Sequence, residues 1–267
     1  GLLIACLIAS ANYVFNEILD APTDRHHPVK RRRPIPSGQA RLSVCWGLWV
    51  ALSVTGLALA WLLNPLFGLA GAALWVMGIL YNLPPIRLKD MPYADVLSES
   101  LNNPIRLAMG WFSTGVLIPP PLSLALTYWM FGAFLMAAKR FAEYRNLADP
   151  QRAARYRRSF GYYTEERLIV SMFFYATLFA LHGGFFISRY HFELILATPP
   201  LAYALAYYLH LSYKPNSPVQ YPERLYRERK LVWLVLLASL ICGTLLFTDL
   251  PAFRQIFHGA FMHGAHP

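Results

Sequence analysis

Oxygen-bearing side chains recur every four residues near the start of the chain. Four of them share one face of a helix if that helix continues far enough, and a fifth, Glu17, adjoins this face. The four are Asn12, Asn16, Asp20 and Asp24. Carboxylates at this spacing repel one another, so a helix gathers them only with a compensating cation. The alternative is a helix end that frays into water and carries acids by chance.

Magnesium suits this pattern. Mg²⁺ is a hard cation that prefers oxygen ligands, and proteins typically hold it by one or two carboxylates together with substrate phosphates. The expected metal ligands are Asn16, Glu17, Asp20 and Asp24. Asp20 and Asp24 are also candidate catalytic residues, whereas Asn12 and Asn16 are candidate substrate-binding residues.

A basic run follows these acids directly. Residues 30–33 are Lys-Arg-Arg-Arg, and Arg25 stands shortly before them. By itself such a run is ordinary for a loop on the cytoplasmic side of a membrane. Beside carboxylates that hold a metal, it would also attract the terminal oxygens of a polyphosphate. We expect Lys30 and Arg33 to be catalytic, because they can neutralise charge on a leaving diphosphate.

A second polar face lies further along, in an otherwise apolar segment. Its members are spaced i, i+4, i+7 and i+11, and they are Asp95, Glu99, Asn102 and Arg106. A charge at the centre of a membrane helix costs roughly 2.5–3.5 kcal/mol on insertion scales, so this face must point into a bundle. We expect Asp95 and Glu99 to be catalytic and Asn102 to bind substrate. The alternative is a structural ion pair, either Glu99 with Arg106 or Asp95 with a loop arginine.

Two shorter clusters complete the candidates. The segment before the second polar face contributes three expected substrate-binding residues, which are Tyr81, Arg87 and Lys89. The other cluster lies where a later apolar stretch ends. There we expect Lys139 and Arg140 to be catalytic and Glu143 to bind substrate. The alternative is an interfacial lysine that snorkels to the surface beside a partner one turn away.

Membrane helices must position these residues. Residues of the AVILMFWYC set make up 56% of the 267-residue chain, and charged residues make up 14% against roughly 25% in soluble domains. The mean hydropathy is +0.36. A soluble domain needs a polar shell that this composition cannot supply, and the same numbers exclude a disordered chain and a disulfide scaffold. The fold class is therefore an all-α, polytopic membrane helix bundle.

The spans follow from windows of about 20 mostly apolar residues, the length that crosses a bilayer core. The eight expected spans are 1–20, 42–63, 66–83, 93–117, 120–140, 167–187, 193–212 and 230–248. All but three of the 24 Lys and Arg residues fall in alternate segments, which the positive-inside rule places in the cytoplasm. These segments are 25–41, 87–89, 139–167 and 214–230. Both termini are then expected on the far side.

The net charge of +10 indicates a cytoplasmic face attracted to anionic lipid headgroups, at about 1 kcal/mol per basic residue. We therefore expect membrane lipids as partners and no nucleic acid. The expected location is the inner, cytoplasmic membrane, which the chain crosses several times, with the active site toward the cytoplasm.

The motif order resembles the UbiA-type intramembrane prenyltransferase superfamily. Residues 16–24 are similar to that family's Asn-Asp-x-x-Asp-x-x-x-Asp signature except at Glu17, and residues 33–38 are Arg-Pro-Ile-x-x-Gly. Residues 81–89 resemble its tyrosine–lysine element. The resemblance implies one transmembrane transferase domain over residues 1–267, with Mg²⁺ between two polar motifs. It also implies nine helices around a central cytoplasm-facing cavity, of which eight are present here and the first is missing.

The third cluster indicates a branch of that family. The family's second Asp-x-x-x-Asp motif is absent near residue 140, where Lys139-Arg-Phe-Ala-Glu143 stands. This resembles the Lys-Arg-Tyr-Ala-Glu element of the branch similar to decaprenyl-phosphate phosphoribosyltransferase. The resemblance implies Mg²⁺-dependent transfer of 5-phosphoribosyl from phosphoribosyl diphosphate to a polyprenyl phosphate. Lys139 and Arg140 would position phosphate or ribose oxygens, and Asp95 and Glu99 would stabilise a cationic centre at the sugar or complete the metal site.

Two other functions stay open at this point. One is prenyl transfer from a prenyl diphosphate to an aromatic, quinone-type acceptor, which uses the same first motif. The other is a non-catalytic membrane subunit or lipid-binding scaffold built on this bundle. A homo-oligomer or a membrane complex is a possible assembly in each case.

Overall fold

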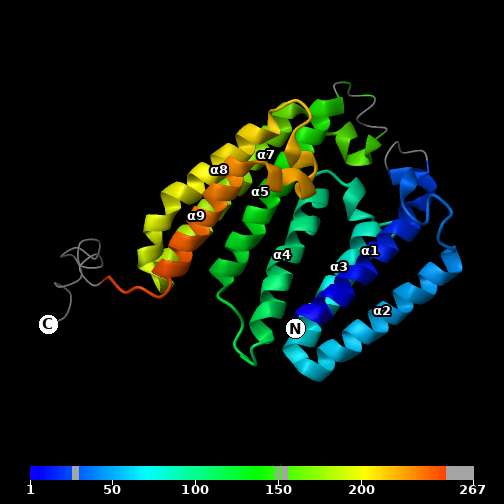
Figure 1. Cartoon of the computed structure of the whole chain (residues 1–267), viewed down its shortest axis with the longest axis horizontal. Coiled ribbons are helices and arrows are strands. Elements are labelled where there is room, and N and C mark those ends of the chain that lie inside the picture. Colours follow the sequence, from blue (N-terminus) through cyan, green and yellow to red (C-terminus); the bar gives the residue numbers. More distant parts are fainter. Residues whose placement is uncertain (26–29, 148, 150, 152–155, 251–267) are drawn as a thin grey trace.

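The protein is built from α-helices. The computed structural model describes residues 1–25, 30–147, 149, 151 and 156–250. Its long helices (Figure 1) are α1 (Leu2–Asp24), α2 (Leu42–Leu63), α3 (Pro65–Asn82), α4 (Ala94–Phe112), α5 (Leu122–Leu147), α7 (Glu165–Tyr190), α8 (Thr198–Ser212) and α9 (Arg229–Leu245). Short 3₁₀ helices lie at Lys30–Arg32, Leu88–Asp90, Arg158–Gly161, Phe192–Ala197, Pro218–Gln220 and Pro222–Arg227. These ranges contain no strand, which confirms the all-α fold class.

Each of the eight expected spans coincides with one of these helices. Six segments are long and apolar enough to cross a membrane: α1, α2, α3, α5, α7 and Phe192–Ser212, which ends in α8. The other two helices fall short for different reasons, since α4 carries three charged side chains and α9 has 17 residues. A count of eight spans therefore stays a prediction.

Two helices extend beyond their expected spans, and both extensions carry candidate site residues. α1 continues through Asp24, so all four members of its polar face do lie on one helix. α5 continues to Leu147, which puts Arg140 and Glu143 one helical turn apart. An apolar window marks the part of a helix that suits hydrocarbon, whereas the backbone hydrogen bonds of the helix continue into polar surroundings.

Local capping explains where two of the helices begin. The side chain of Asn64 accepts hydrogen bonds from the backbone N–H groups of Leu66 and Phe67, and Pro65 occupies the first helical position of α3. At the start of α7, Oγ1 of Thr164 accepts from the N–H of Arg167 at 3.1 Å. The α2–α3 connection is therefore a tight turn, as the Asn-Pro pair requires.

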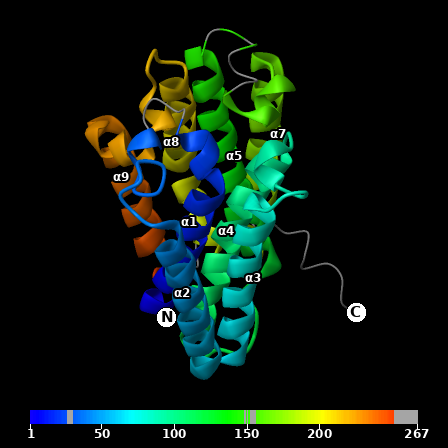
Figure 2. The same cartoon turned by 90° about the vertical axis from the view of Figure 1, so that its right-hand side faces the viewer.

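The helices pack largely in chain order. α1 contacts α2 and α3, α3 contacts α4, and α4 contacts α5, which in turn packs against α7 and α8. Figure 1 shows α1, α2 and α3 at one end of the bundle and α7, α8 and α9 at the other, with α4 between them. After a quarter turn, the end of the bundle with α1, α2 and α3 faces the viewer (Figure 2). α4 is thus the helix through which the two ends of the bundle meet.

Apolar side chains fill two large cores and a smaller one around Ile18 and Ile35, and they also cover much of the outside. One core lies around α5 and α7 and includes Phe141 and Leu168, and a second, with Ile8 and Phe67, lies among α1, α3 and α4. Many large apolar side chains outside these cores are exposed, as with Leu62 at 82% and Trp233 at 70%. Extended apolar surface of this kind suits contact with lipid rather than with water.

Candidate active site

The end of α1 is held by two groups of cations. Asp24 is 4% exposed and accepts a hydrogen bond from Nη1 of Arg33 at 3.0 Å. The Lys30 ammonium lies 3.8 Å from the other carboxylate oxygen. The side chains of Lys30 and Arg33 are 38% and 41% exposed, so these cations are open to solvent on one side. The carboxylate of Asp24 can therefore exchange them for a ligand.

Asp20, one turn earlier, binds two other cations. Its Oδ1 accepts from Nζ of Lys89 at 2.6 Å and from Nη2 of Arg87 at 3.0 Å. The same lysine ammonium donates to the side-chain oxygens of Asn16 at 3.2 Å and Asn82 at 2.8 Å. Since an ammonium has three donors, Lys89 is fully used in tying α1 to the end of α3. We call Asp20, Asp24 and their four cations, Lys30, Arg33, Arg87 and Lys89, the α1 cluster.

The 3₁₀ turn Leu88–Asp90 positions this lysine. Arg87 precedes the turn with a φ of 35°, and its Nε lies 3.0 Å from the carboxylate of Asp90. Lys89 is only 7% exposed. Burial lowers the pKa of the Lys89 ammonium, and the carboxylate of Asp20 acts in the opposite direction.

Two of the expected residues have structural partners. Nδ2 of Asn12 donates to the carbonyl of Leu74 at 2.8 Å, and the same side chain packs against Gly78, so Asn12 joins α1 to α3. Oε1 of Glu17 accepts from the backbone N–H of Ile35 at 2.9 Å, which fixes the loop that carries Arg33. Across the described ranges, no group of three or more His, Cys, Asp or Glu residues is placed to hold a metal ion. The metal ligands and the binding role of Asn12 stay predictions.

A second cluster surrounds the guanidinium of Arg140, which is 2% exposed. Its Nε lies 3.1 Å from Asp95, its Nη2 lies 2.9 Å from Glu99, and its Nη1 lies 3.1 Å from Glu143. Three carboxylates thus surround one arginine, which we call the Arg140 cluster. Such burial is tolerated only where the charges are paired and hydrogen-bonded, as they are here.

The loop before α7 completes this cluster. The sequence suggested an ion pair of Asp95 with a loop arginine, but it did not single out the loop residues that the structure brings here. Asp95 is fully buried and accepts from the hydroxyl of Tyr163 at 2.6 Å and from that of Ser159 at 3.2 Å. Nε of Arg157 lies 3.6 Å from the same carboxylate. No periodic pattern marks these loop residues, because a loop's register is decided by its tertiary contacts. The only available signal was the high basic content of 139–167.

Arg157 and Tyr81 connect the two clusters. The hydroxyl of Tyr81 donates to Glu99 at 2.9 Å and accepts from Nη2 of Arg157 at 3.0 Å. Nε of Arg157 also donates to the backbone carbonyl of Lys89 at 3.3 Å. Side chains from α1, α3, α4 and α5 and from the two loops that carry Lys89 and Arg157 are therefore part of one continuous polar network, beside which lie Asp24 and its cations.

The remaining candidates lie at the edges of this network. Lys139 makes no direct ion pair with described residues, but its charge acts on Glu99, whose side chain is 36% exposed although it accepts two hydrogen bonds. Oδ1 of Asn102 is buried without a hydrogen-bond partner. Arg106 is exposed and is not paired with Glu99, so the ion pair considered from the sequence does not form.

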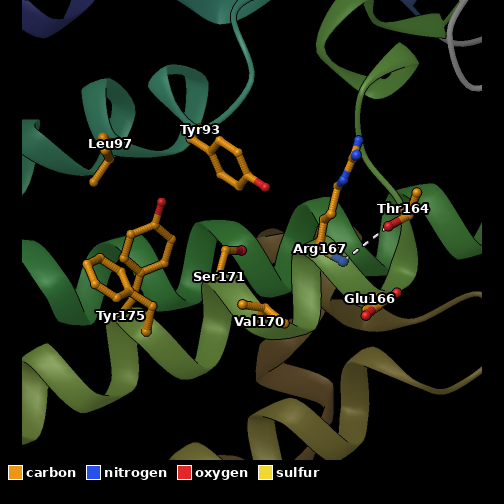
Figure 3. Close-up of a pocket in the computed structure, with 9 residues that line it drawn as sticks. Tyr93, Leu97, Thr164, Glu166, Arg167, Val170, Ser171 and Tyr175 are labelled. Atoms are coloured by element: carbon orange, nitrogen blue, oxygen red, sulfur yellow. Dashed lines mark hydrogen bonds between the residues drawn. The ribbon is translucent and has the colours of Figure 1, made fainter.

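A cavity of about 650 Å³ opens elsewhere, between the start of α4 and α7. Figure 3 shows Tyr93 and Leu97 on one side and Val170, Ser171 and Tyr175 on the other. It contains none of the expected site residues. It is linked to the network by the backbone N–H of Tyr93, which donates to the Tyr163 hydroxyl. The central cytoplasm-facing cavity expected from the sequence is therefore a different feature and stays a prediction.

The part of the chain that carries the polar network matches a known protein family. The UbiA prenyltransferase family matches residues 1–223, a range that includes every candidate site residue. The chain belongs to the UbiA prenyltransferase family. With six apolar helices of membrane length, this member of the UbiA family is an integral, multi-pass membrane protein.

Two relatives of this chain share one name. The chain is 35% identical over 164 residues to a decaprenyl-phosphate phosphoribosyltransferase of Mycobacterium tuberculosis. The aligned region covers 61% of this chain and 51% of the relative. It is 32% identical over 165 residues to the enzyme of that name from Corynebacterium glutamicum, covering 60% and 47%. The chain thus spans about half the length of these relatives.

A solved UbiA structure shares the fold. A UbiA homolog from Archaeoglobus fulgidus, bound to GPP and Mg²⁺, superposes with a TM-score of 0.69 over 92% of this chain and 86% of that one. The two sequences are 18% identical, so this likeness supports the helix arrangement alone.

Proposed function

We propose that this UbiA-family chain transfers 5-phosphoribosyl from phosphoribosyl diphosphate to a polyprenyl phosphate. The observation that carries the proposal is the Arg140 cluster. At this place on α5, Arg140 engages Asp95, Glu99 and Glu143, and no aspartate pair is present to hold a second metal. The likeness to two relatives named decaprenyl-phosphate phosphoribosyltransferase supports the same donor.

The α1 cluster fits the diphosphate end of such a donor. Asp20 and Asp24 supply carboxylate oxygens and Asn16 an amide oxygen, which is the donor chemistry that Mg²⁺ prefers. The ion would be held by these residues, with Glu17 the nearest further acid, and it would supply positive charge to the leaving diphosphate. The A. fulgidus homolog bound to GPP and Mg²⁺ is consistent with this assignment.

The cations of the α1 cluster would move from carboxylates to substrate. Arg33 and Lys30 are two-fifths exposed, so they can turn toward diphosphate oxygens, and Mg²⁺ would then keep the buried carboxylate of Asp24 paired. Arg87 would contribute in the same way, while Lys89 holds Asp20 and Asn16 in place. These groups stabilise negative charge that grows as the bond from the sugar to the diphosphate breaks.

The acceptor needs little activation. A polyprenyl phosphate oxygen is already ionised, so it forms the new bond to the anomeric carbon while diphosphate leaves with the bonding electron pair. Glu99 is the acid that faces open space and is suited to stabilise a cationic sugar centre. Asp95 is fully buried by its partners, and we assign it a positioning role for Arg140. Lys139 is suited to contact substrate phosphate or ribose oxygens.

We further propose that the chain works in the inner membrane with this network at the cytoplasmic side. The basic loops that the positive-inside rule assigns to the cytoplasm supply Lys30, Arg33, Arg87 and Arg157 to the network. The apolar outer surface would accommodate the polyprenyl chain and membrane lipids. Whether the protein forms an oligomer or a membrane complex stays a prediction.

A donor competition tests the proposal. Purified full-length chain in lipid nanodiscs receives labelled phosphoribosyl diphosphate with a polyprenyl phosphate, or labelled prenyl diphosphate with an aromatic acceptor, each with Mg²⁺ or with EDTA. Mg²⁺-dependent labelling of the lipid by the first donor is the expected result. Turnover with prenyl diphosphate alone would instead establish prenyl transfer, which the GPP-bound homolog favours. Inactivity in both arms, with cellular function retained after alanine replaces Asp20 and Asp24, would indicate a scaffold.

A further inference from the structure

Arg106 is a charged residue in an expected membrane span, and it has no hydrogen bond or ion pair among the described residues. It lies in α4 and is exposed. The acid that the helix spacing offers it, Glu99, is instead bound to Arg140 and Tyr81. Ionisable residues within spans are rare and mark substrate or ion pathways, because an unpaired charge is costly there.

The position of Arg106 on α4 turns it toward the bundle interior. Glu99 lies seven residues earlier, which is two helical turns, so the two residues share a face. Through its partners, Glu99 touches α3 on one side and α5 on the other. This face of α4 therefore lies between those two helices.

The flanks of Arg106 confirm this orientation. Met109, three residues later, packs in the core shared by α1, α3 and α4. Asn103, three residues earlier, packs against Gly132 of α5. Since both flanks pack against neighbouring helices, Arg106 lies between these two contacts and is exposed there.

The depth of Arg106 places it beneath the Arg140 cluster. Seven residues of α-helix span about 10 Å, so its Cα lies that far below Glu99, away from the polar end of the bundle. Helical side chains lean toward the N-terminus of their helix, which for α4 is the end that carries Asp95. The guanidinium can therefore approach the level of Asn102 and Glu99 from below.

Asn102 provides an independent sign of a ligand. Its Oδ1 is buried and has no hydrogen-bond partner. Buried polar atoms without partners are uncommon, and each calls for a missing donor. An amide oxygen accepts only from a donor, so a bare phosphate does not satisfy it, whereas a hydroxyl group does.

We propose that Arg106 and Asn102 form the subsite for the phosphorylated sugar of the donor. This inference rests on the proposed function. A phosphate ester offers the anionic oxygens that an arginine fork binds, and sugar hydroxyls offer the donors that Oδ1 lacks. A prenyl diphosphate has no hydroxyl group to satisfy Asn102.

The subsite complements the α1 cluster. Phosphoribosyl diphosphate is anionic at both ends, and the α1 cluster takes the diphosphate in the proposed reaction. Arg106 takes the phosphate at the other end, which orients the anomeric carbon between the two sites. Its role is binding and orientation rather than charge stabilisation on the leaving group.

Binding of two separate probes tests this division. Purified full-length chain in detergent is titrated by calorimetry with ribose 5-phosphate alone and with pyrophosphate plus Mg²⁺. Arg106→Gln should weaken ribose 5-phosphate binding about ten- to a hundred-fold, the usual effect of losing a charged hydrogen bond. Pyrophosphate binding should change less than about twofold. Arg106→Lys should lie between wild type and Arg106→Gln, because it keeps the charge and loses the fork.

The matched control is Arg189→Gln. Arg189 is exposed and lies in the last turn of α7, so this variant should bind both probes as wild type does. Wild type that does not bind ribose 5-phosphate would overturn the subsite. So would an Arg106→Gln protein that binds it normally. Equal loss of both probes in the glutamine and lysine variants would also overturn it, since that indicates a structural role.

Kinetics separates this inference from the proposed function. With labelled phosphoribosyl diphosphate, Arg106→Gln should raise the KM for the donor and leave the KM for the polyprenyl phosphate unchanged. A wild-type protein that uses the donor, with an unchanged donor KM in the variant, would refute the subsite alone. A wild-type protein that uses only prenyl diphosphate would refute both.

Discussion

The α1 cluster and the Arg140 cluster use the same kinds of side chain but differ in exposure. Asp24 faces cations whose side chains are 38% and 41% exposed, whereas the side chains of Arg140 and Asp95 are 3% and 0% exposed. Exposed ion pairs contribute about 0–1 kcal/mol, while breaking a buried pair costs about 3–5 kcal/mol. The first cluster can therefore exchange partners with a substrate, and the second holds helices in position.

Asp20 and Lys89 stand between these extremes. Their side chains are 13% and 9% exposed, and the contact between them is 2.6 Å. Lys89 also holds the side chains of Asn16 and Asn82, so it aligns the acidic face of α1 with the end of α3. Substrate exchange is therefore expected at Asp24 first, with Asp20 kept in place by its lysine.

The largest expected effect is on stability, from Arg140→Met. The change leaves Asp95, Glu99 and Glu143 without their shared cation, and removing one partner of a buried ion pair costs about 3–5 kcal/mol. Thermal unfolding of the purified protein in detergent measures the loss. Arg145→Gln is the matched control on the same helix, since its pair with Glu165 is exposed and worth at most about 1 kcal/mol. Equal losses in the two variants would contradict the proposed division between the clusters.

The next effect is on activity, from Asp24→Asn. The change removes a proposed metal ligand and keeps a side chain of the same shape, and the cation partners remain in contact with water, so the stability loss should be smaller than in Arg140→Met. Transfer to the lipid should fall about 100-fold or more, as when a group that stabilises transition-state charge is lost. The measurement is initial rate at saturating Mg²⁺ beside a melting curve. A large drop in stability with a near-normal rate would contradict this assignment, because it would show that Asp24 holds the fold together rather than binding substrate.

A smaller effect is expected from Tyr163→Phe. This removes the hydrogen bond of 2.6 Å to the buried carboxylate of Asp95, which keeps Arg140 and Ser159 as partners, and the bond that the hydroxyl accepts from the backbone N–H of Tyr93. Hydrogen bonds to charged groups contribute about 1.5–3 kcal/mol, so the variant should lose stability by about that amount. The control is Tyr226→Phe, whose ring is 67% exposed and whose loss should have little effect. An unchanged melting temperature for Tyr163→Phe would mean that Asp95 is held by its other partners alone.

The helical parts of this site could be predicted from the sequence. Helix periodicity is a local property, so spacing alone placed Asn16, Asp20 and Asp24 on one face and Asp95 and Glu99 on another. Apolar composition likewise gave the fold class and the approximate spans. These features need no knowledge of which helix packs against which.

The pairing of charges could not be predicted, because it depends on contacts between distant segments. Spacing along α4 suggested Glu99 with Arg106, yet Glu99 pairs across 41 positions with Arg140, which packing of α4 on α5 brings close. Arg157 and Tyr163 lie in a loop without periodicity, so nothing local marks them as partners of Asp95.

The smallest expected effect is a difference in stability between the wild type and Tyr163→Phe at alkaline pH, and it tests how closely Asp95 is enclosed in the Arg140 cluster. Burial raises the pKa of the Tyr163 hydroxyl above its ordinary value of about 10, and the nearby Asp95 carboxylate raises it further. The unfolded chain then releases this proton at a lower pH than the folded protein does, so stability falls as pH rises through about 10. Between pH 9 and 10.5 the wild type should lose about 0.8 kcal/mol more than Tyr163→Phe. Parallel stability curves for the two proteins would show that Tyr163 ionises freely, and that Asp95 is less enclosed than the contacts around it indicate.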